Sequence, residues 1–364
     1  MPLYCPTHIR LTQQPPPPIP TPILHIGVSL DSVFDFSEEK RLLKEQGNEA
    51  YKKYVRSHLF EPLEPAKAFP FVAKMLSFND SQNTLVQVTL IANCTPETIL
   101  RAKHSMHCHK LIDPLRPEHC SGLTAQFGGN ALNKVLSRNS VDLFLSPNPN
   151  DVETLLSLGY CAGHVEAGRA RDEQFENYKA AVIAFDFDRV IGVACGQDGT
   201  KDQFIDNDNY TTVQGLEAAW QREHECRKTP AHKGPLSPFF EKLFALRDLV
   251  NACPDKYNLS IPIVTARTGQ SLGRVETTLK AWGIEPDGIL STGWDRKGEV
   301  LKDIHATAHF DDSLKHIQEA YEKSPQTTPF HVPWVDTHLD QIKKRCHCPN
   351  APMHQLRPAP AYAP

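Results

Sequence analysis

The sequence predicts an α/β fold built around a parallel sheet, and three observations support this prediction. Short apolar runs alternate with amphipathic helical stretches along most of the 364 residues. One run, AVIAF, leads directly into two carboxylates, Asp186 and Asp188. A hydroxyl, a lysine and a second acidic pair follow at the ends of later elements. Because open α/β sheets bind ligands at the carboxyl ends of their strands, this order predicts a site at one edge of the sheet.

Composition narrows the class of protein. The length suits about two domains, and 40% apolar residues are enough for a packed core. The formal net charge of −4 provides no basic footprint for a nucleic acid polymer or a membrane surface. We expect neither a signal peptide nor a membrane span. The ten cysteines form no C-x-x-C pair, so reduced thiols and a cytoplasmic location are expected.

The first half is expected to occupy residues 23–170, after a Pro-rich tail at 1–22. A segment rich in Glu, Lys and Ala predicts an exposed amphipathic helix with Ser37 as its N-cap. A Thr-Pro-Glu sequence at Thr95 predicts the start of another helix. The sequence predicts strands at 23–30, 86–93 and 141–146, and helices at 37–59, after the prolines of 61–70, from 95 onward and at 151–158.

The second half is expected to occupy residues 179–332, before a polar C-terminal tail at 333–364. An insert with little periodicity, at about 192–258, separates its first two strands. The sequence predicts strands at 181–186, 261–268 and 306–312, and helices at 238–253, 271–282 and 297–304.

The two halves repeat the same order of strands and helices, which suggests an internal duplication. Placing HIGVSLDSVF over VIAFDFDRVI preserves the pattern but not the reactive side chains. We therefore expect the first half to be a degenerate, catalytically silent copy, although coincidence among α/β patterns is the alternative. The aligned pairs are Ser29 with Asp186, Asp31 with Asp188, Ala92 with Thr265, Leu132 with Lys297, and Ser146 with Asp311.

The side chains at the strand ends of the second half predict phosphate chemistry. Asp186 and Asp188 would repel each other unless a cation intervened, which favours Mg²⁺ and leaves one carboxylate as a nucleophile. Thr265 could donate a hydrogen bond to a phosphate oxygen, and Lys297 could neutralise charge. A pair of hard oxygen ligands ends a later strand, at Asp311 and Asp312. For the first pair alone, a strand that merely ends in acidic residues is the alternative.

These residues match a known family. DFDRVI, VTART, WDRKG and HFDDS resemble motifs one to four of the haloacid dehalogenase superfamily of phosphohydrolases. Longer stretches, such as VTARTGQSLGRVETTLKAWGIEPDGIL, resemble the cytosolic 5′-nucleotidase I family, over about 23–322. The resemblance implies a Rossmann-like haloacid dehalogenase fold whose cap is the insert. Arg189 departs from the family, which usually has a small residue there.

The resemblance also implies a reaction, the Mg²⁺-dependent hydrolysis of nucleoside 5′-monophosphates such as AMP or IMP. Asp186 would attack phosphorus and form an aspartyl-phosphate. Asp188 would protonate the leaving oxygen and then deprotonate water. Thr265 and Lys297 would hold the phosphate, as would Arg267, for which a surface role is the alternative. The implied Mg²⁺ ligands are the Asp186 carboxylate, the Asp188 backbone carbonyl, and Asp311 or Asp312.

Several alternatives stay open from the sequence. The substrate could be another small phosphomonoester such as a sugar phosphate, or the chain could bind nucleotides without turnover. The first half could bind an effector nucleotide or form a homo-oligomer interface. Aromatic residues of the insert could stack on a base or fill the cap core: Phe204, Tyr210, Trp220 and Phe239. Two His/Cys groups, around His104–Cys120 and Cys346–His354, fit no standard zinc spacing.

Overall fold

The computed structural model describes residues 23–79, 83–111, 123–127, 132–175, 180–193, 221, 223–252, 258–293 and 297–334. Both expected tails lie outside these residues, except for Pro333 and Trp334. Most of the expected insert, at 194–220, also lies outside them, together with Phe204, Tyr210 and Trp220. The group at Cys346–His354 is outside as well, as are His119 and Cys120.

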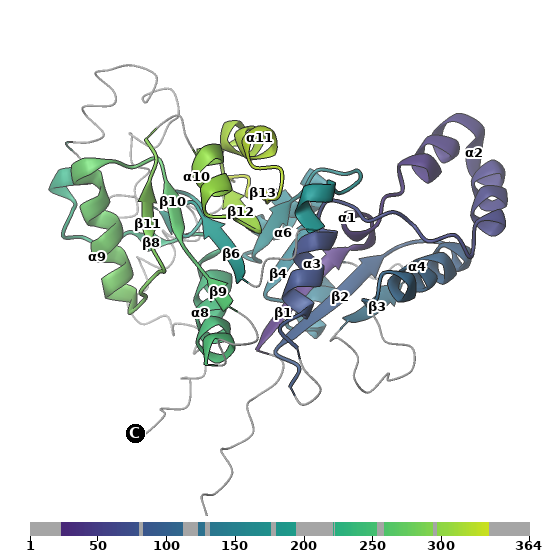
Figure 1. The fold of residues 1–364 in the computed structure, drawn as a ribbon, viewed down its shortest axis with the longest axis horizontal. Helices are drawn as coiled ribbons and strands as arrows, with labels where there is room; N and C mark the ends of the chain where they lie inside the picture. The colour runs from purple at the N-terminus through teal and green to yellow at the C-terminus, as the bar shows by residue number, and fades with distance from the viewer. Residues whose placement is uncertain are drawn as a thin grey trace, which may run out of the picture.

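One sheet runs through both halves of the chain (Figure 1). Its main path has the order β11-β10-β6-β12-β13-β5-β4-β1-β2-β3, and β9 pairs with β6 off this path. All pairs within each half are parallel, and the halves join through the antiparallel pair β13–β5. The first-half strands are β1 (Leu24–Ser29), β2 (Val86–Ala92), β3 (Leu123–Phe127), β4 (Leu143–Ser146) and β5 (Ala162–His164). The second-half strands are β6 (Ala180–Phe185), β9 (Asn258–Ser260), β10 (Ile263–Thr265), β11 (Ile289–Ser291), β12 (Ala308–Asp311) and β13 (Thr328–His331).

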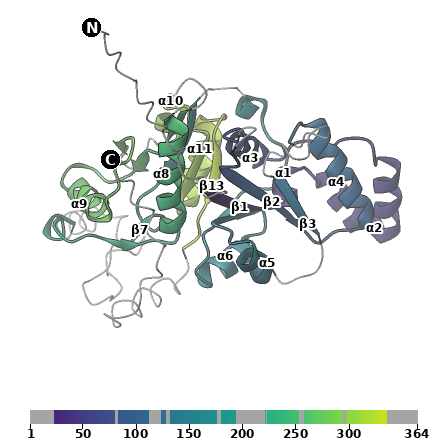
Figure 2. The same cartoon turned by 90° about the horizontal axis from the view of Figure 1, so that it is seen from below.

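Helices lie on both faces of the sheet, as the two views together show (Figures 1 and 2). A small antiparallel pair, β7 (Gly192–Val193) with β8 (His232–Lys233), stands apart from the sheet. The first-half helices are α1 (Leu30–Val33), α2 (Ser37–Ser57), α3 (Phe69–Leu76), α4 (Pro96–Cys108), α5 (Leu132–Arg138) and α6 (Pro149–Ser157). The second-half helices are α8 (Ser237–Asn251), α9 (Leu272–Trp282), α10 (Lys297–Asp303) and α11 (Leu314–Lys323).

The predicted α/β class is confirmed, with corrections in detail. Thr95 caps α4 as expected, since its side chain accepts the N–H of Thr98. Ser37 is not an N-cap; it is the first residue of α2 and follows Phe36, while the Asp35 carboxylate accepts its N–H at 2.9 Å. The sequence did not predict five strands of three to five residues: β3, β5, β9, β11 and β13.

The strand ladders of the two halves have the same order and register. Read outward from the central β5–β13 pair, the order is β5-β4-β1-β2-β3 in one half and β13-β12-β6-β10-β11 in the other. This register agrees with the sequence alignment that sets Ser29 against Asp186. The corresponding pairs are Val28–Leu90 with Phe185–Ile263, Val28–Leu145 with Phe185–Phe310, and Ser146–His164 with Asp311–His331.

Local details repeat as well. The Asn79 side chain accepts the N–H and donates to the carbonyl of Val86, both at 2.8 Å. Asn251 makes the same two hydrogen bonds with Leu259, at 2.8 and 2.9 Å. Asn79 follows α3 and Asn251 ends α8, so each asparagine lies between a helix and the next strand. The loop before β4 and the loop before β12 each contain a left-handed residue, Ser140 at φ 50° and His305 at φ 51°.

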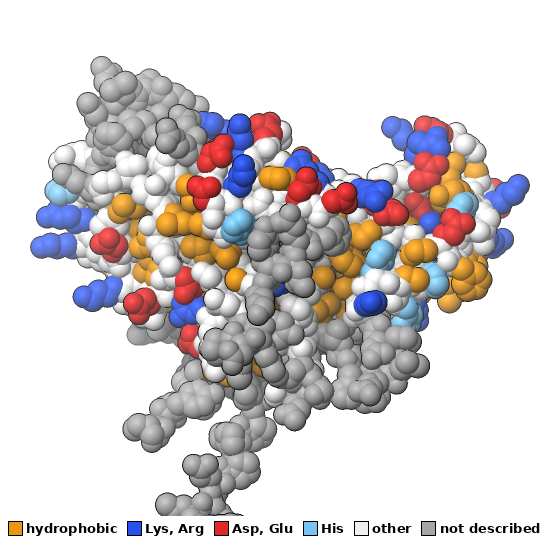
Figure 3. All heavy atoms as spheres, viewed as in Figure 1, with side chains coloured by type: hydrophobic (Ala, Val, Ile, Leu, Met, Phe, Trp, Pro, Cys, Tyr) orange, Lys and Arg blue, Asp and Glu red, His pale blue; other side chains and the backbone are white. Residues whose placement is uncertain are grey.

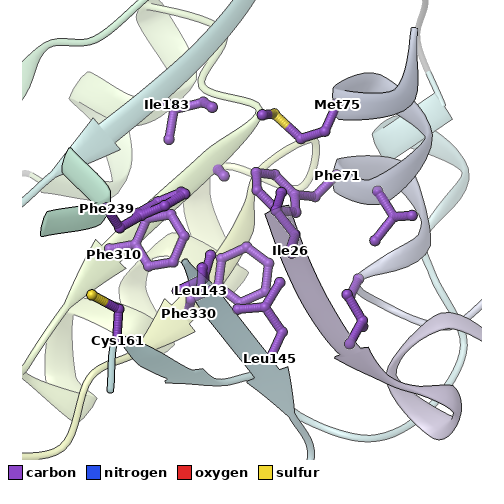
Figure 4. Packing of buried hydrophobic residues seen from close by; sticks show 14 of the residues in the cluster. Ile26, Phe71, Met75, Leu143, Leu145, Cys161, Ile183, Phe239, Phe310 and Phe330 are labelled. Carbon is purple, nitrogen blue, oxygen red and sulfur yellow. The ribbon is translucent and has the colours of Figure 1, made fainter. Parts of the chain in front are cut away.

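The main hydrophobic core is shared by the two halves (Figure 4). Phe71 of α3 packs against Phe310 and Phe330 of the second half, with ring centroids 6.3 and 5.2 Å apart. Phe239 of α8 packs against Phe310 at 5.7 Å and is fully buried. The helix α8, which lies within the expected insert of 192–258, thus packs into this core. Phe239 is core and is not available to stack on a base.

The surface and the helices fit the composition. On the face drawn in Figure 3, acidic and basic side chains are interspersed along the upper rim. Among the described residues, every helix is too short or too polar to cross a membrane.

Candidate functional site

The end of β6 positions the first two carboxylates. The Asp186 N–H donates to the Phe310 carbonyl of β12 at 2.8 Å, so the Asp186 backbone still pairs with the neighbouring strand at the carboxyl end of β6. The chain then turns sharply, and the Gly192 N–H returns to the Phe187 carbonyl at 2.8 Å. A Cβ on Gly192 would lie 2.6 Å from the Phe187 ring, which explains the glycine. Phe187 is fully buried, and this burial anchors the turn that carries both carboxylates.

Lys297 connects the first and last acidic motifs. It is the first residue of α10, and its side chain is 1% exposed. Its Nζ lies 2.8 Å from Asp186 Oδ1 and 2.6 Å from Asp311 Oδ2. Burial alone would lower its pKa, but the two carboxylates outweigh burial and raise the pKa. Lys297 is therefore a buried cation between two buried carboxylates.

The two aspartates that end β12 have different surroundings. Asp311 is fully buried, and besides Lys297 its oxygens contact His309 at 3.0 Å, His316 at 3.2 Å and the Ser313 N–H at 2.8 Å. Burial would raise its pKa, but these partners, led by Lys297, hold it well below its usual range. Asp311 is thus ionised and fixed in place.

Asp312 has fewer compensating partners. Its Oδ2 lies 3.6 Å from Arg189 Nη1, a loose ion pair. Burial, with repulsion from Asp311 and Asp186, raises its pKa well above the usual range. Burial also raises the pKa of Asp186 to about 6, against the opposing charge of Lys297. When ionised, Asp186, Asp311 and Asp312 carry three negative charges against the two positive charges of Lys297 and Arg189, and a further cation would relieve the repulsion.

The donor set fits Mg²⁺. Ligand oxygens of Asp186, Asp311 and Asp312 lie within 4.8 Å of one another, and this is the only such group among the residues that the structure describes. All three donors are carboxylates, the hard oxygen ligands that Mg²⁺ prefers. Since Asp311 is already held by Lys297 and two histidines, Asp186 and Asp312 have the greater need for a cation. In the first-half His/Cys group, the residues that the structure describes do not form a set of three metal ligands. Within this group, His104 Nε2 lies 3.3 Å from Cys108 Sγ, both on α4.

Thr265 and Arg267 follow β10. Thr265 is fully buried, and its hydroxyl oxygen accepts the Arg267 N–H at 3.2 Å, so its own proton remains to be donated. The Arg267 guanidinium is bound to carboxylates: Nε and Nη2 donate to the two oxygens of Asp188, each at 2.7 Å. Partial burial would raise the pKa of Asp188, but Arg267 outweighs burial and holds the pKa below its usual range.

Two residues without a sequence signal complete this arrangement. Nη1 of Arg267 also donates to the Glu223 carboxylate, whose other oxygen accepts from Arg274 Nη1 at 3.0 Å. Arg274, on α9, is 1% exposed. Glu223 comes from a stretch without periodicity, so no pattern could have predicted it. By contrast, His309 lies two residues before Asp311 on the same strand face, and this spacing could have identified it.

The structure thus brings together most of the predicted site. Asp186, Lys297, Asp311 and Asp312 form one cluster, while Asp188 faces Arg267 beside it. Of the third motif, WDRKG, only Lys297 and Gly298 lie among the described residues.

Comparison with known proteins agrees with this geometry. A 5′-nucleotidase family model matches residues 19–337. The chain belongs to the 5′-nucleotidase family. Over 319 residues it is 27% identical to cytosolic 5′-nucleotidase 1B of Homo sapiens, an alignment that covers 84% of this chain and 48% of that protein. The chain therefore spans about half the length of this curated relative. The predicted resemblance to the cytosolic 5′-nucleotidase I family is confirmed, and its motif residues supply the acidic cluster.

Proposed function

We propose that the protein hydrolyses nucleoside 5′-monophosphates, of the AMP or IMP type, to nucleoside and phosphate. The observation that carries the proposal is the buried cluster of Asp186, Lys297, Asp311 and Asp312 at the end of β6 and β12, in a chain of the 5′-nucleotidase family. The name of the relative adds the expectation of a cytosolic location. An Mg²⁺ ion bound by Asp186, Asp312 and the Asp188 carbonyl would screen charge on the transferring phosphoryl group.

The side chains of the site have distinct proposed roles. Asp186, ionised by its contact with Lys297, attacks phosphorus and forms an aspartyl-phosphate. Lys297 stays in place and offsets the charge of both the carboxylate and the phosphoryl oxygens. Thr265 donates its hydroxyl proton to a phosphoryl oxygen.

Asp188 handles the protons. It donates one to the leaving 5′-oxygen and then accepts one from the water that cleaves the acyl-phosphate. The Arg267 ion pair favours its charged form, which suits the second step. Proton donation in the first step starts from the less populated protonated form. Arg267, which the sequence suggested as a phosphate ligand, has its fork engaged by carboxylates and is not assigned that role.

We propose two refinements of the domain organisation. The first half is a degenerate copy of the second. This is supported by the equal strand order, by the equal register of the strand pairs, and by the paired hydrogen bonds that Asn79 and Asn251 each make to the following strand. An experimental structure whose halves do not superpose at these positions would refute this. The cap is the segment between β7 and α8, about 194–236, so that it is shorter than the sequence predicted.

The test is phosphate release from a panel of nucleoside monophosphates and sugar phosphates with Mg²⁺. We expect Asp186→Asn to lower kcat on the order of 10⁴-fold or more, the cost typical of losing a nucleophile. A first-half carboxylate serves as the control: Asp31→Asn, at the position that corresponds to Asp188, should leave kcat within about twofold since surface changes far from a site have little effect. Chelation of Mg²⁺ should stop the wild-type reaction.

Other outcomes would change the proposal in defined ways. Turnover of sugar phosphates alone would keep the mechanism and discard the nucleoside specificity. Turnover of no monophosphate would replace the enzyme with a nucleotide-binding protein. Equal losses from Asp186→Asn and Asp31→Asn would contradict the assignment of the site to the second half.

A further inference from the structure

The strongest arrangement that the proposed reaction leaves unexplained is a chain of alternating charges. It runs from Asp188 through Arg267 and Glu223 to Arg274. The side chains of Arg267, Glu223 and Arg274 are 10%, 12% and 1% exposed. A buried chain of this kind requires that every member be paired, because an unpaired buried charge is strongly destabilising. Each side chain of this series is therefore held in its orientation by the oppositely charged side chains next to it.

The first link aligns a planar fork with a carboxylate. Nε and Nη2 of Arg267 donate to different oxygens of Asp188, which is the bidentate geometry that arginine makes and lysine cannot. This contact fixes the plane of the Asp188 carboxylate as well as its position. The guanidinium also lies 5.4 Å above the buried Phe187 ring, which supports it from one side.

The second link joins Arg267 to Glu223, on the side of the guanidinium that faces away from Asp188. Nη1 of Arg267 donates to Glu223 and to the Ser271 carbonyl, at 3.1 Å for the latter. With four of its five N–H groups engaged, the guanidinium is held in one orientation, with its Nε edge toward Asp188. Glu223 is the charged group in this set that comes from the insert, and among the described residues Arg267 links it to the reacting carboxylate.

The third link anchors Glu223 itself. Arg274 donates Nη1 to Glu223 and Nε to the Thr229 carbonyl at 3.1 Å. The following turn of α9 adds Thr278, whose hydroxyl accepts the Ala231 N–H at 2.9 Å. Residues 223–231 are thus tied to α9 at several points, and Glu223 is presented to Arg267 from a fixed support.

We propose that Glu223 is a positioning residue, which acts through Arg267 to orient Asp188 for proton transfer. The proposal rests on the proposed hydrolysis of monophosphates, for which Asp188 is the acid and base. Arg267 is then a positioning residue too, and the return segment of the insert, 223–231, becomes part of the catalytic scaffold. Proton transfer needs donor and acceptor within hydrogen-bond reach, so a tilted carboxylate lowers the rate without weakening substrate binding.

Steady-state kinetics of the full chain with AMP or the best substrate of the panel test this. We expect Glu223→Gln to lower kcat about tenfold, with KM and the inhibition constant of inorganic phosphate within about twofold. Arg267→Gln should lower kcat at least as much. The double variant should be no worse than Arg267→Gln, because Glu223 is proposed to act on Asp188 through Arg267.

A matched control separates positioning from loss of stability. Glu39 in α2 is a buried carboxylate paired with Arg101, in the first half and far along the chain from the site. We expect Glu39→Gln to lower the melting temperature at least as much as Glu223→Gln while kcat stays within about twofold. An unchanged kcat in Glu223→Gln would overturn the proposal, as would additive losses in the double variant. A phosphate inhibition constant weakened about tenfold or more in Arg267→Gln would also overturn it, because the fork would then bind phosphate.

A second measurement does not depend on turnover. In thermal unfolding, Glu223→Gln and Asp188→Asn should be non-additive, since both remove a partner of the same guanidinium. If the wild type releases no phosphate, the proposed function fails and this cycle still decides whether Glu223 is coupled to Asp188. Additive shifts in melting temperature would mean that it is not.

Discussion

The two halves of the sheet have the same ladder register but very different charges at equivalent positions. At the end of β6, Asp186 is 5% exposed and contacts the buried Lys297. At the end of β1, Ser29 donates its hydroxyl to Asp31, whose carboxylate also pairs with the exposed Lys40 at 2.7 Å. Leu132 occupies the position that corresponds to Lys297. The same backbone therefore supports a buried ionic cluster in one half and an ordinary surface ion pair in the other.

This difference teaches what holds the site together. Strand order and register come from apolar residues such as Val28 and Phe185, which are fully buried in both halves. In the described part of the second half, Lys297 compensates the charges of Asp186 and Asp311 together, so each of these residues depends on the others. Changes in the cluster should therefore have large effects, whereas the same changes at equivalent first-half positions should have small ones.

The largest effect on stability is expected from Lys297→Met. The change leaves Asp186 and Asp311 without their shared cation, and breaking a buried pair in this way costs roughly 3 to 5 kcal/mol. Urea unfolding in the presence of a chelator measures it. Leu132→Met is the matched control and should change the free energy of unfolding by less than about 1.5 kcal/mol.

The pH dependence of this loss is a sharper test. Burial raises the folded pKa of Asp186 to about 6, above its unfolded value of 3.8, so the folded state takes up the proton first as pH falls. The buried negative charge of Asp186 therefore destabilises the fold above pH 6, and protonation removes this cost below pH 6. Without Lys297 the cost is larger, so the loss of unfolding free energy in Lys297→Met, relative to wild type, should become smaller from pH 8 to pH 5. A loss that stays constant across this range would contradict the assignment of buried charge.

The next largest effect is expected from Gly298→Ala. A Cβ at this position in α10 would lie 2.7 Å from the Glu319 carbonyl oxygen and 2.8 Å from Lys323 Cβ, both on α11. Alanine favours helix by about 1 kcal/mol, but overpacking against a backbone atom costs about 1 to 3 kcal/mol. We expect net destabilisation and a lower kcat, since Lys297 precedes it. Urea unfolding and kinetics measure both.

The corresponding residue of the first half provides the control. Asn133 in α5 is exposed, and Asn133→Ala should be neutral or slightly stabilising. If Gly298→Ala raises the free energy of unfolding as Asn133→Ala does, the close contact between α10 and α11 at Gly298 would be contradicted.

Much of the fold could be predicted from the sequence, because its signals are local. AVIAF is a continuous apolar run, VQVTL is rich in β-branched residues, and Thr95-Pro96 is a helix start that depends on three neighbouring residues. Alignment of the halves even predicted which strands correspond, although β5 and β13 were missed. Those two strands are three and four residues long, and their pairing depends on the contact between the halves, which no local pattern encodes.

The sequence predicted the site residues that lie at the ends of strands, but it did not predict Glu223, which comes from the insert. Asp186, Thr265 and Asp311 end apolar runs, so topology alone brings them to one edge. Glu223 reaches Arg267 from an aperiodic stretch, across 44 positions of sequence. The sequence also could not tell that Arg267 faces Asp188, because an arginine after a strand can bind phosphate or carboxylate equally well.

The smallest effect is expected from His25→Val, a change to the residue that the second half has at the equivalent position, Val182. His25 is 5% exposed, and its Nε2 lies 2.8 Å from the Thr89 hydroxyl. Losing its hydrogen bonds should cost about 1 kcal/mol at pH 7.5. Burial lowers the folded pKa of His25 below the unfolded value of 6.5, so the unfolded state binds the proton first as pH falls.

The stability contributed by the neutral imidazole is therefore present above pH 6.5 and lost below it. Melting temperatures between pH 7.5 and pH 5.5 should fall less steeply in His25→Val than in wild type. His107→Gln, an exposed change on α4, should keep the wild-type slope. An unchanged slope in His25→Val would mean that the buried imidazole does not couple folding to acid, and that this position distinguishes the two halves only by shape.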